Sequence, residues 1–146
     1  RQLANTIPML IWIADTTKAC TWFNDGWLAF TGRTLEQEYG NGWAEGVHPD
    51  DFQRCLDVYA TAFDRRKPFE MEYRLRHHDG TYHWLIDRGA PQYNAAGVFT
   101  GYIGGCVDIQ DKRAILSSWA SDTSAVQAGR ITIAVRPRYS FRSSMR

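Results

Sequence analysis

The sequence predicts an α+β fold: a five-stranded antiparallel sheet with helices on one face and a C-terminal exit helix. Two patterns predict it. Residues 52–63 carry a single apolar stripe at the 3.6-residue period of a helix, whereas residues 69–76 alternate apolar and charged side chains, as a strand with one solvated face does. Turn signals then place hairpins on either side of a block of helices, and hairpins join antiparallel strands.

A hairpin and a short helix are expected first along the chain. Residues 9–15 form an apolar run that ends in a polar turn, and residues 19–23 are expected to return beside it as the partner strand. Both alternating sets of side chains in the first strand are apolar, so either set could face the core. Asn24 or Asp25 can then cap a short helix, which Gly32 ends.

A second short helix and a loop are expected next. Thr34 and Gln37 have the spacing of a capping box, in which side chains and backbone amides satisfy each other at a helix start. This helix is expected to stop by Gly40. Residues 41–47 hold two glycines and are expected to form a loop that carries Trp43.

The stretch EGVHPDDF, residues 45–52, could be a metal site, an acid–base cluster or a helix start. Proline suits the first helical turn, and the helix dipole favours both following aspartates there. Adjacent aspartates point about 100° apart on a helix and cannot share one substrate. We therefore predict a long helix over about residues 50–66 and no metal at His48 or Asp50. Replacing Asp50 by alanine is expected to cost about 0.5–1 kcal/mol.

Three strands and an exit helix are expected after the long helix. Residues 69–76 form the alternating strand, and the Asp-Gly pair at 79–80 is a strong hairpin turn. The next strand is expected to turn Trp84 toward the core. Residues 98–109 form a last, glycine-rich strand, and residues 111–119 are expected to form a helix that leaves the domain.

Composition indicates one folded domain in a reducing compartment. The chain has 146 residues, of which 44% are apolar, enough for one domain with a core. Its three cysteines, Cys20, Cys55 and Cys106, are widely spaced and form no C-x-x-C pair, which favours reduced thiols and a cytoplasmic location. The chain begins without methionine, so we interpret it as a piece of a longer protein, which leaves room for a membrane segment in the parent.

Charge separates a mildly acidic body from a basic tail. Residues 1–119 hold 12 Lys and Arg against 15 Asp and Glu, a net charge of −3, and offer no basic stripe for nucleic acid. Residues 120–146 hold five arginines and one aspartate, a net charge of +4. We assign residues 114–146 to the exit helix and this tail, and predict that the tail packs as an added strand or arm and helps to form a homodimer.

Four phrases in order resemble the PAS domain of the type whose second half is called the PAC motif. They are WIADTTKACTWFNDGWLAFTGRT (12–34), GNGWAEGVHPDDF (40–52), FEMEYRLRHHDGTYHWLIDRGAP (69–91) and GYIGGCVDIQDKR (101–113), within a domain of about residues 5–113. The resemblance implies a five-stranded sheet cradling helices, with an interior cleft that in some members holds heme, flavin or a small metabolite. It also implies an input module joined to an effector domain in the same polypeptide.

The sequence departs from the cofactor motifs of this family. Photoreactive flavin-binding members carry a cysteine in an Asn-Cys-Arg-Phe phrase after the first hairpin, but residues 32–49 contain no cysteine, and Cys55 falls on the apolar stripe. Heme-binding members of the best-known type use a histidine within the long helix, where this chain has only His48 at the start. The cofactor therefore stays unassigned, and we expect no metal site.

The exit of the domain also departs from the family pattern. The family usually shows Asp-Ile-Thr there, whereas this chain reads Asp108-Ile109-Gln110. Asp108 can still pair with an arginine such as Arg113. We predict that Asp108, Gln110 and Arg113 form the exit through which a signal leaves.

Aromatic side chains are the remaining indication of function. Between sheet and helices we expect Trp27, Phe30, Trp43, Tyr59, Phe63, Tyr73, Trp84 and Ile103. These side chains either fill a solid core or line a cleft for a small apolar or aromatic ligand, held without a covalent bond. An enzyme is not expected, because the chain has no phosphate loop, G-x-S-x-G elbow or H-E-x-x-H motif.

We therefore expect a sensor domain of a larger signal-transduction protein, such as a histidine kinase or a cyclic-dinucleotide enzyme. It would relay the state of a ligand or partner through its C-terminal helix. The alternative is a ligand-free PAS module for dimerisation or protein interaction.

Overall fold

The computed structural model describes residues 9–110, which form one antiparallel sheet with helices. The elements are β1 (Leu10–Ala14), β2 (Cys20–Phe23), α1 (Asp25–Thr31), α2 (Leu35–Glu38), the 3-10 helix η2 (Gly42–Gly46), α3 (Pro49–Arg65), β3 (Phe69–Arg76), β4 (Tyr82–Tyr93) and β5 (Phe99–Asp108). The five strands lie in the order β2-β1-β5-β4-β3, so the predicted fold class is confirmed. The predicted exit helix and basic tail lie outside the described residues.

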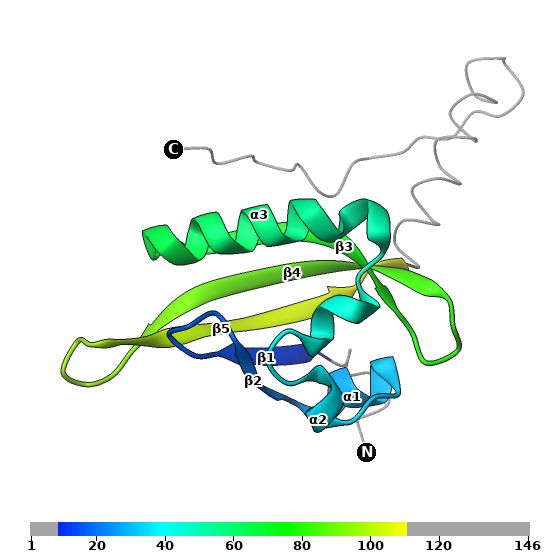
Figure 1. Cartoon of the computed structure of the whole chain (residues 1–146), viewed down its shortest axis with the longest axis horizontal. Helices are drawn as coiled ribbons and strands as arrows, with labels where there is room; N and C mark the ends of the chain where they lie inside the picture. Colours follow the sequence, from blue (N-terminus) through cyan, green and yellow to red (C-terminus); the bar gives the residue numbers. More distant parts are fainter. Residues whose placement is uncertain (1–8, 111–146) are drawn as a thin grey trace, which may run out of the picture. The chain divides into compact units, whose positions relative to one another are not determined.

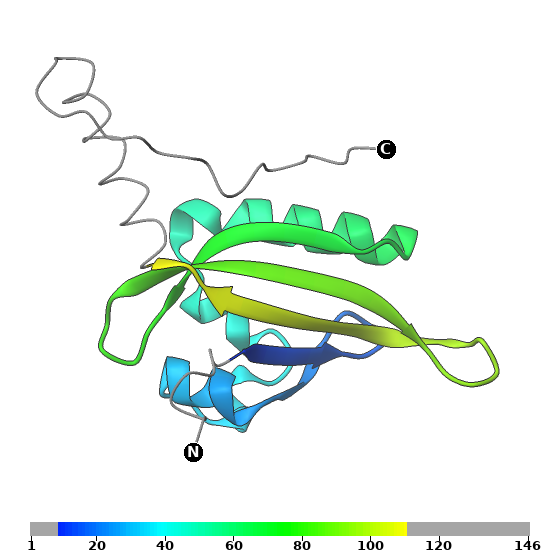
Figure 2. The ribbon, with the colours of Figure 1, turned by 180° about the vertical axis from the view of Figure 1, so that it is seen from behind.

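The helices lie beside different strands of the sheet. Helix α3 runs along the β3 side, whereas α1 and α2 lie near β1 and β2, as the two opposite views show (Figure 1, Figure 2). The side chains between these helices and the sheet form the core. Within residues 9–110, no helix is long and apolar enough to span a membrane.

The stretch EGVHPDDF starts the long helix, as predicted. The proline occupies the first helical turn, and His48 caps the helix, because its Nδ1 accepts a hydrogen bond from the Asp50 amide at 3.1 Å. The predicted stripe faces the core and buries Cys55, Tyr59 and Phe63. The predicted helix of about residues 50–66 is confirmed.

The short helices form where capping residues predict them. Asn24 Oδ1 accepts a hydrogen bond from the Trp27 amide at 3.0 Å, and α1 ends at Gly32, whose φ of 67° suits glycine. Thr34 and Gln37 form the predicted capping box at the start of α2. Residues 41–47 were predicted as a loop but contain the 3-10 helix η2, a tight turn that needs only i to i+3 hydrogen bonds.

Trp84 does not face the core, contrary to the prediction. Side chains directly opposite each other on paired strands share a face, and β4 places Leu85 opposite the fully buried Tyr73. Trp84 pairs instead with Arg74, whose guanidinium lies 4.8 Å from the centre of the indole ring. Apolar residues occur on both faces of β4, so alternation alone pointed to the wrong face.

Ile103 also lies on the face of the sheet away from the helices, contrary to the prediction. It pairs with Ile13 on β1 and Ala90 on β4, and it is 37% exposed. Its neighbour Tyr102 is fully buried on the helix-covered face. In β1, the set that faces the core is Leu10, Trp12 and Ala14.

Replacing Gly104 by alanine is expected to lower the free energy of unfolding by about 1–3 kcal/mol, the usual cost of overpacking a core. Gly104 pairs with Trp12, and an added Cβ would lie 2.1 Å from atoms of the indole ring. Urea denaturation measures the change. Gly105→Ala is the matched control, because its methyl group would meet the flexible end of Met9. An equal loss in both variants would contradict the specific contact with Trp12.

Candidate functional site

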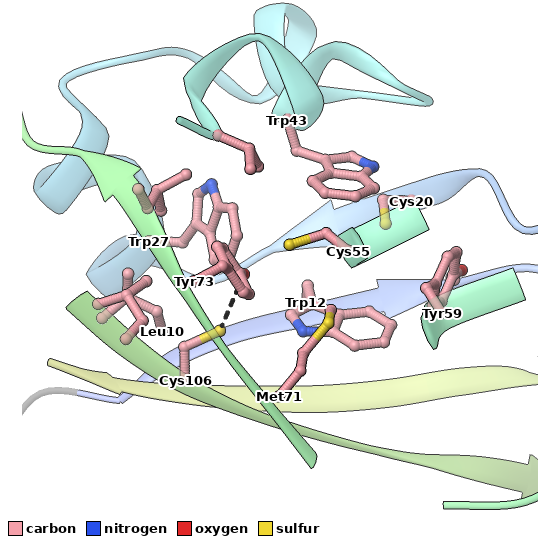
Figure 3. Close-up of a cluster of buried hydrophobic side chains, with 14 of the residues drawn as sticks. Leu10, Trp12, Cys20, Trp27, Trp43, Cys55, Tyr59, Met71, Tyr73 and Cys106 are labelled. Atoms are coloured by element: carbon pink, nitrogen blue, oxygen red, sulfur yellow. Dashed lines mark hydrogen bonds between the residues drawn. The ribbon is translucent and has the colours of Figure 1, made fainter. Parts of the chain in front are cut away.

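A small cavity lies inside the aromatic core. Figure 3 shows buried side chains that line it, among them Trp12, Trp43 and Tyr59. Its volume is about 20 Å³, room for a single water molecule. It is lined by Trp12, Cys20, Phe23, Trp27, Trp43, Tyr59, Phe69, Met71, Tyr73 and Asp87. The rings pack largely edge to face, as Tyr59 does against Trp12 at 5.8 Å between ring centres. The rings therefore fill most of the space between sheet and helices.

Four of the eight predicted cleft residues meet at this cavity: Trp27, Trp43, Tyr59 and Tyr73. Phe63 is buried nearby, stacked on Tyr102 with 4.8 Å between ring centres. The Phe30 ring lies elsewhere, edge-on to His77 and His83 in the β3–β4 hairpin. Trp84 and Ile103 face away from the helices, as described above.

Asp87 is the one acidic residue among the residues that line the cavity. Its side chain is 3% exposed, and it accepts hydrogen bonds from Trp12 Nε1 at 3.0 Å and from the Tyr73 hydroxyl at 3.1 Å. Burial raises the pKa of Asp87 to about 6, because the loss of water outweighs these hydrogen bonds. The prediction that Trp84 faces the core puts Asp87, three residues further along the strand, on the opposite face, so sequence reasoning missed it. A buried carboxylate on an aromatic cavity can hold a ligand group that donates a hydrogen bond.

Trp43 presents a hydrogen-bond donor with no partner. Its side chain is 8% exposed, and among the buried side-chain polar atoms of residues 9–110, Trp43 Nε1 alone has no hydrogen bond. Buried polar groups are nearly always paired, so an orphan donor indicates a missing water or ligand. Trp43 was predicted for the cleft, but its unpaired indole N–H could be found only from the packed structure.

The three cysteines are buried and free. Burial raises the pKa of Cys55 to about 12, and it also raises the pKa of Cys20 and Cys106 above the ordinary thiol value. These thiols stay protonated at neutral pH and are poor nucleophiles. Cys55 packs in the core, as its place on the apolar stripe predicts.

The last described residues form a small hydrogen-bonded group at the end of β5. Asp108 Oδ2 lies 2.7 Å from His83 Nδ1, and Asp108 Oδ1 accepts a hydrogen bond from the Gln110 amide at 2.9 Å. Gln110 Oε1 in turn accepts a hydrogen bond from the Trp84 amide at 3.1 Å. Two of the three predicted exit residues are thus tied to β4, and Arg113 lies outside the described residues.

One group of side chains in the described chain could hold a metal ion. His77, Asp79 and His83 offer ligand atoms that lie within 4.8 Å of one another. They belong to the β3–β4 hairpin and do not touch the cavity. His48 is not part of this group, because its Nδ1 caps α3.

The sequence matches known proteins along most of its length. The profile of a family described as PAS fold matches residues 21–105. Protein y4lL of Sinorhizobium fredii is 40% identical over 113 residues, which cover 77% of this chain and 14% of that protein. The peroxide stress-activated histidine kinase mak1 of Schizosaccharomyces pombe is 28% identical over 154 residues, which cover 99% of this chain and 9% of the kinase. The chain thus spans a small part of these relatives.

Solved structures share the fold. The N-terminal domain of a diguanylate cyclase with PAS/PAC sensor from Marinobacter aquaeolei superimposes with a TM-score of 0.63 and 22% identity, covering 72% of this chain and 98% of that one. A sensory box histidine kinase/response regulator from Burkholderia thailandensis gives a TM-score of 0.62 and 20% identity, covering 87% and 95%. Because the family profile covers more than half of the chain and the sheet and helices agree with it, the chain belongs to the PAS fold family.

Proposed function

We propose that this PAS domain is the sensor of a larger cytoplasmic signal-transduction protein, such as a histidine kinase or a cyclic-dinucleotide enzyme. A PAS domain is a sensory module and not itself catalytic. The matched histidine kinase supports this class of parent protein. The chain covers only 9% of that kinase, as one sensor domain of a longer protein would. The effector would lie in the same polypeptide, and the signal would leave through the chain that follows β5.

We infer that the signal is a small, mainly aromatic molecule that carries a hydrogen-bond acceptor. The observation that supports this most strongly is the unpaired Nε1 of Trp43, one of the residues that line the cavity. Asp87 supplies a second polar group, which would pair with a donor on the ligand. Aromatic walls with a few fixed polar groups are typical of small-molecule sites.

Binding would require the core to open. Pockets for drug-sized ligands measure about 300–1,000 Å³, whereas this cavity measures about 20 Å³. The ligand would therefore favour an expanded arrangement over the closed one, and a differential affinity of this kind is what allows a ligand to shift a conformational equilibrium. Trp27 on α1 and Trp43 on η2 close the side of the cavity opposite the sheet, so these elements would have to move.

The thiols do not favour a peroxide-sensing role through cysteine chemistry. Two relatives are named as peroxide stress-activated kinases. Peroxide reacts with thiolates, and the three buried cysteines of this chain stay protonated. The proposal therefore rests on non-covalent binding in the core.

Phenol and benzene are suitable probes for this site, because they differ by one hydroxyl group. We expect phenol to bind and to raise the melting temperature of the domain. Trp43→Phe should weaken phenol binding about two- to tenfold, the value of one hydrogen bond, while benzene binding changes little. Calorimetric titration measures both affinities. Failure of phenol to shift the NMR signal of the Trp43 indole N–H at saturating concentration would reject the proposed site.

The second candidate is a ligand-free module that dimerises or docks a partner. The nearly filled core favours it, because a PAS domain without a ligand needs no larger cavity. Native mass spectrometry of the purified domain would separate the two: a bare homodimer supports the module. Truncation after Trp119 tests whether the basic tail helps to form the dimer. If it does, light scattering should show that the truncated chain no longer dimerises. An unchanged dimer would exclude that role.

A further inference from the structure

The β3–β4 hairpin brings two imidazoles and a carboxylate together. His77 Nδ1 lies 3.0 Å from Asp79 Oδ1, and His83 Nε2 lies 3.1 Å from the Thr81 hydroxyl. The same hydroxyl donates a hydrogen bond to Asp79 Oδ1 at 2.6 Å. Asp79 and His83 thus contact the same hydroxyl group, and the ligand atoms of all three residues lie within 4.8 Å of one another.

We propose that His77, Asp79 and His83 bind a divalent transition ion such as Zn²⁺, with the remaining coordination positions open to water or to a ligand. Imidazole nitrogen suits this class of ion, and a set of two histidines and one carboxylate is known among its sites. The site is separate from the interior cavity and does not depend on whether that cavity binds a molecule.

The backbone of the hairpin holds the carboxylate in place. Asp79 Oδ1 accepts hydrogen bonds from the amide and the hydroxyl of Thr81. The turn is closed by the His77 amide, which donates to the Thr81 carbonyl at 2.7 Å, and by the Gly80 amide, which donates to the His77 carbonyl at 2.9 Å. Gly80 has a φ of 89°, which suits glycine. The position of one ligand is thus set before any ion arrives.

A second carboxylate orients one of the imidazoles. Asp108 Oδ2 lies 2.7 Å from His83 Nδ1, which leaves Nε2 of the same ring directed to the cluster. Metal-binding histidines almost always place their other nitrogen against a carboxylate or carbonyl group in this way. Asp108 is therefore a positioning residue for the site. It also connects the site to the end of β5, where the signal is proposed to leave.

Ion binding requires one local change. The rings of His77 and His83 are stacked, with 4.6 Å between centres and 6° between planes, so their nitrogen lone pairs lie in nearly parallel planes and do not converge on one point. Neighbouring ligands around a tetrahedral Zn²⁺ lie about 3.4 Å apart, for bonds of about 2.1 Å. The partly exposed His77 side chain would have to rotate out of the stack. Binding of an ion would thus replace the stacking of the two rings with coordination by them.

Calorimetric titration of the full chain with Zn²⁺, after removal of metals with a chelator, tests the proposal. We expect one Zn²⁺ per chain and no comparable binding of Mg²⁺, which prefers oxygen ligands. His77→Ala and His83→Ala should each weaken Zn²⁺ binding at least about tenfold, and Asp108→Asn about 10- to 100-fold. His78→Ala is the control from the same hairpin: its ring packs on His77 with 3.9 Å between ring centres but offers no ligand atom to the group, so the variant should leave the affinity within about twofold.

A second measurement distinguishes a variant that fails to fold from one that folds but has lost a metal ligand. NMR signals of the His77 and His83 rings should shift on addition of Zn²⁺, whereas the Trp12 and Trp27 indole signals of the core should stay in place in every variant that folds. The proposal is overturned if Zn²⁺ does not bind at one equivalent. It is also overturned if the His77→Ala and His83→Ala variants keep full affinity, or if His78→Ala loses as much affinity as they do.

Discussion

Replacing Asp51 by alanine is expected to lower the free energy of unfolding by about 3 kcal/mol, the lower end of the range for breaking a buried ion pair. Asp51 is 4% exposed and accepts three hydrogen bonds from Arg74: from the amide at 2.9 Å, Nε at 2.9 Å and the terminal guanidinium nitrogen at 3.0 Å. The lower end applies because the Arg74 side chain is 25% exposed and water can reach its charge. The pair fastens the start of α3 to β3.

Asp50 is the matched control, because it is the adjacent aspartate on the same helical turn. Its side chain is 78% exposed, and Asp50→Ala is expected to cost about 0.5–1 kcal/mol through the helix dipole. Urea denaturation of both variants at pH 7 measures the difference. Arg74 lowers the pKa of Asp51 to about 2, so the added stability is present above pH 4 and is lost as pH falls through about 2. Equal losses in the two variants at pH 7 would show that the ion pair contributes little.

Replacing Asp87 by asparagine is expected to make the domain more stable at pH 7.5 by up to about 3 kcal/mol. Burial raises the pKa of Asp87 from 3.8 to about 6 in the folded protein. Between these pH values the native state binds more protons than the unfolded state, so the wild-type protein loses stability as pH rises through this window. Asparagine keeps the shape and an acceptor for Trp12 Nε1, and it carries no charge to bury.

The difference between the wild-type protein and the Asp87→Asn variant isolates this residue from other carboxylates. Urea denaturation of both proteins at pH 4, 5, 6 and 7.5 gives that difference directly. It should grow in favour of the variant from pH 4 to pH 6 and then level off. Two stability curves that stay parallel across this range would mean that burial does not raise the pKa of Asp87 in the folded protein.

Local patterns were sufficient to predict the elements of this fold. The stripe on α3, the capping box at Thr34 and the alternation of β3 each depend on residues close in sequence, because hydrogen bonds within one turn or one strand favour them. Apart from η2, which was predicted as a loop, the bounds that were predicted within residues 9–110 agree with the structure to within about two residues. The antiparallel arrangement follows from the hairpins.

The site could be predicted only in part, because its remaining features depend on strand register. The facing of β4 is set by its pairing with β3 and β5, which buries Asp87 and turns Trp84 outward. Its apolar residues occur on both faces, so the sequence alone did not choose between them. Likewise, the contact of Asp51 with Arg74 joins residues 23 positions apart. Nothing in the local pattern around either residue indicates that pair.

The position of β1 between β2 and β5 determines when the domain can fold during synthesis. The β1–β5 ladder joins Leu10 to Cys106, so one edge of the first hairpin has no partner strand until the final strand has left the ribosome. At about 5–20 residues per second, the nascent chain spends about 5–20 seconds with this edge unpaired. An open strand edge is a template for pairing with other chains, so this interval is the period in which chaperone binding to the nascent chain matters most.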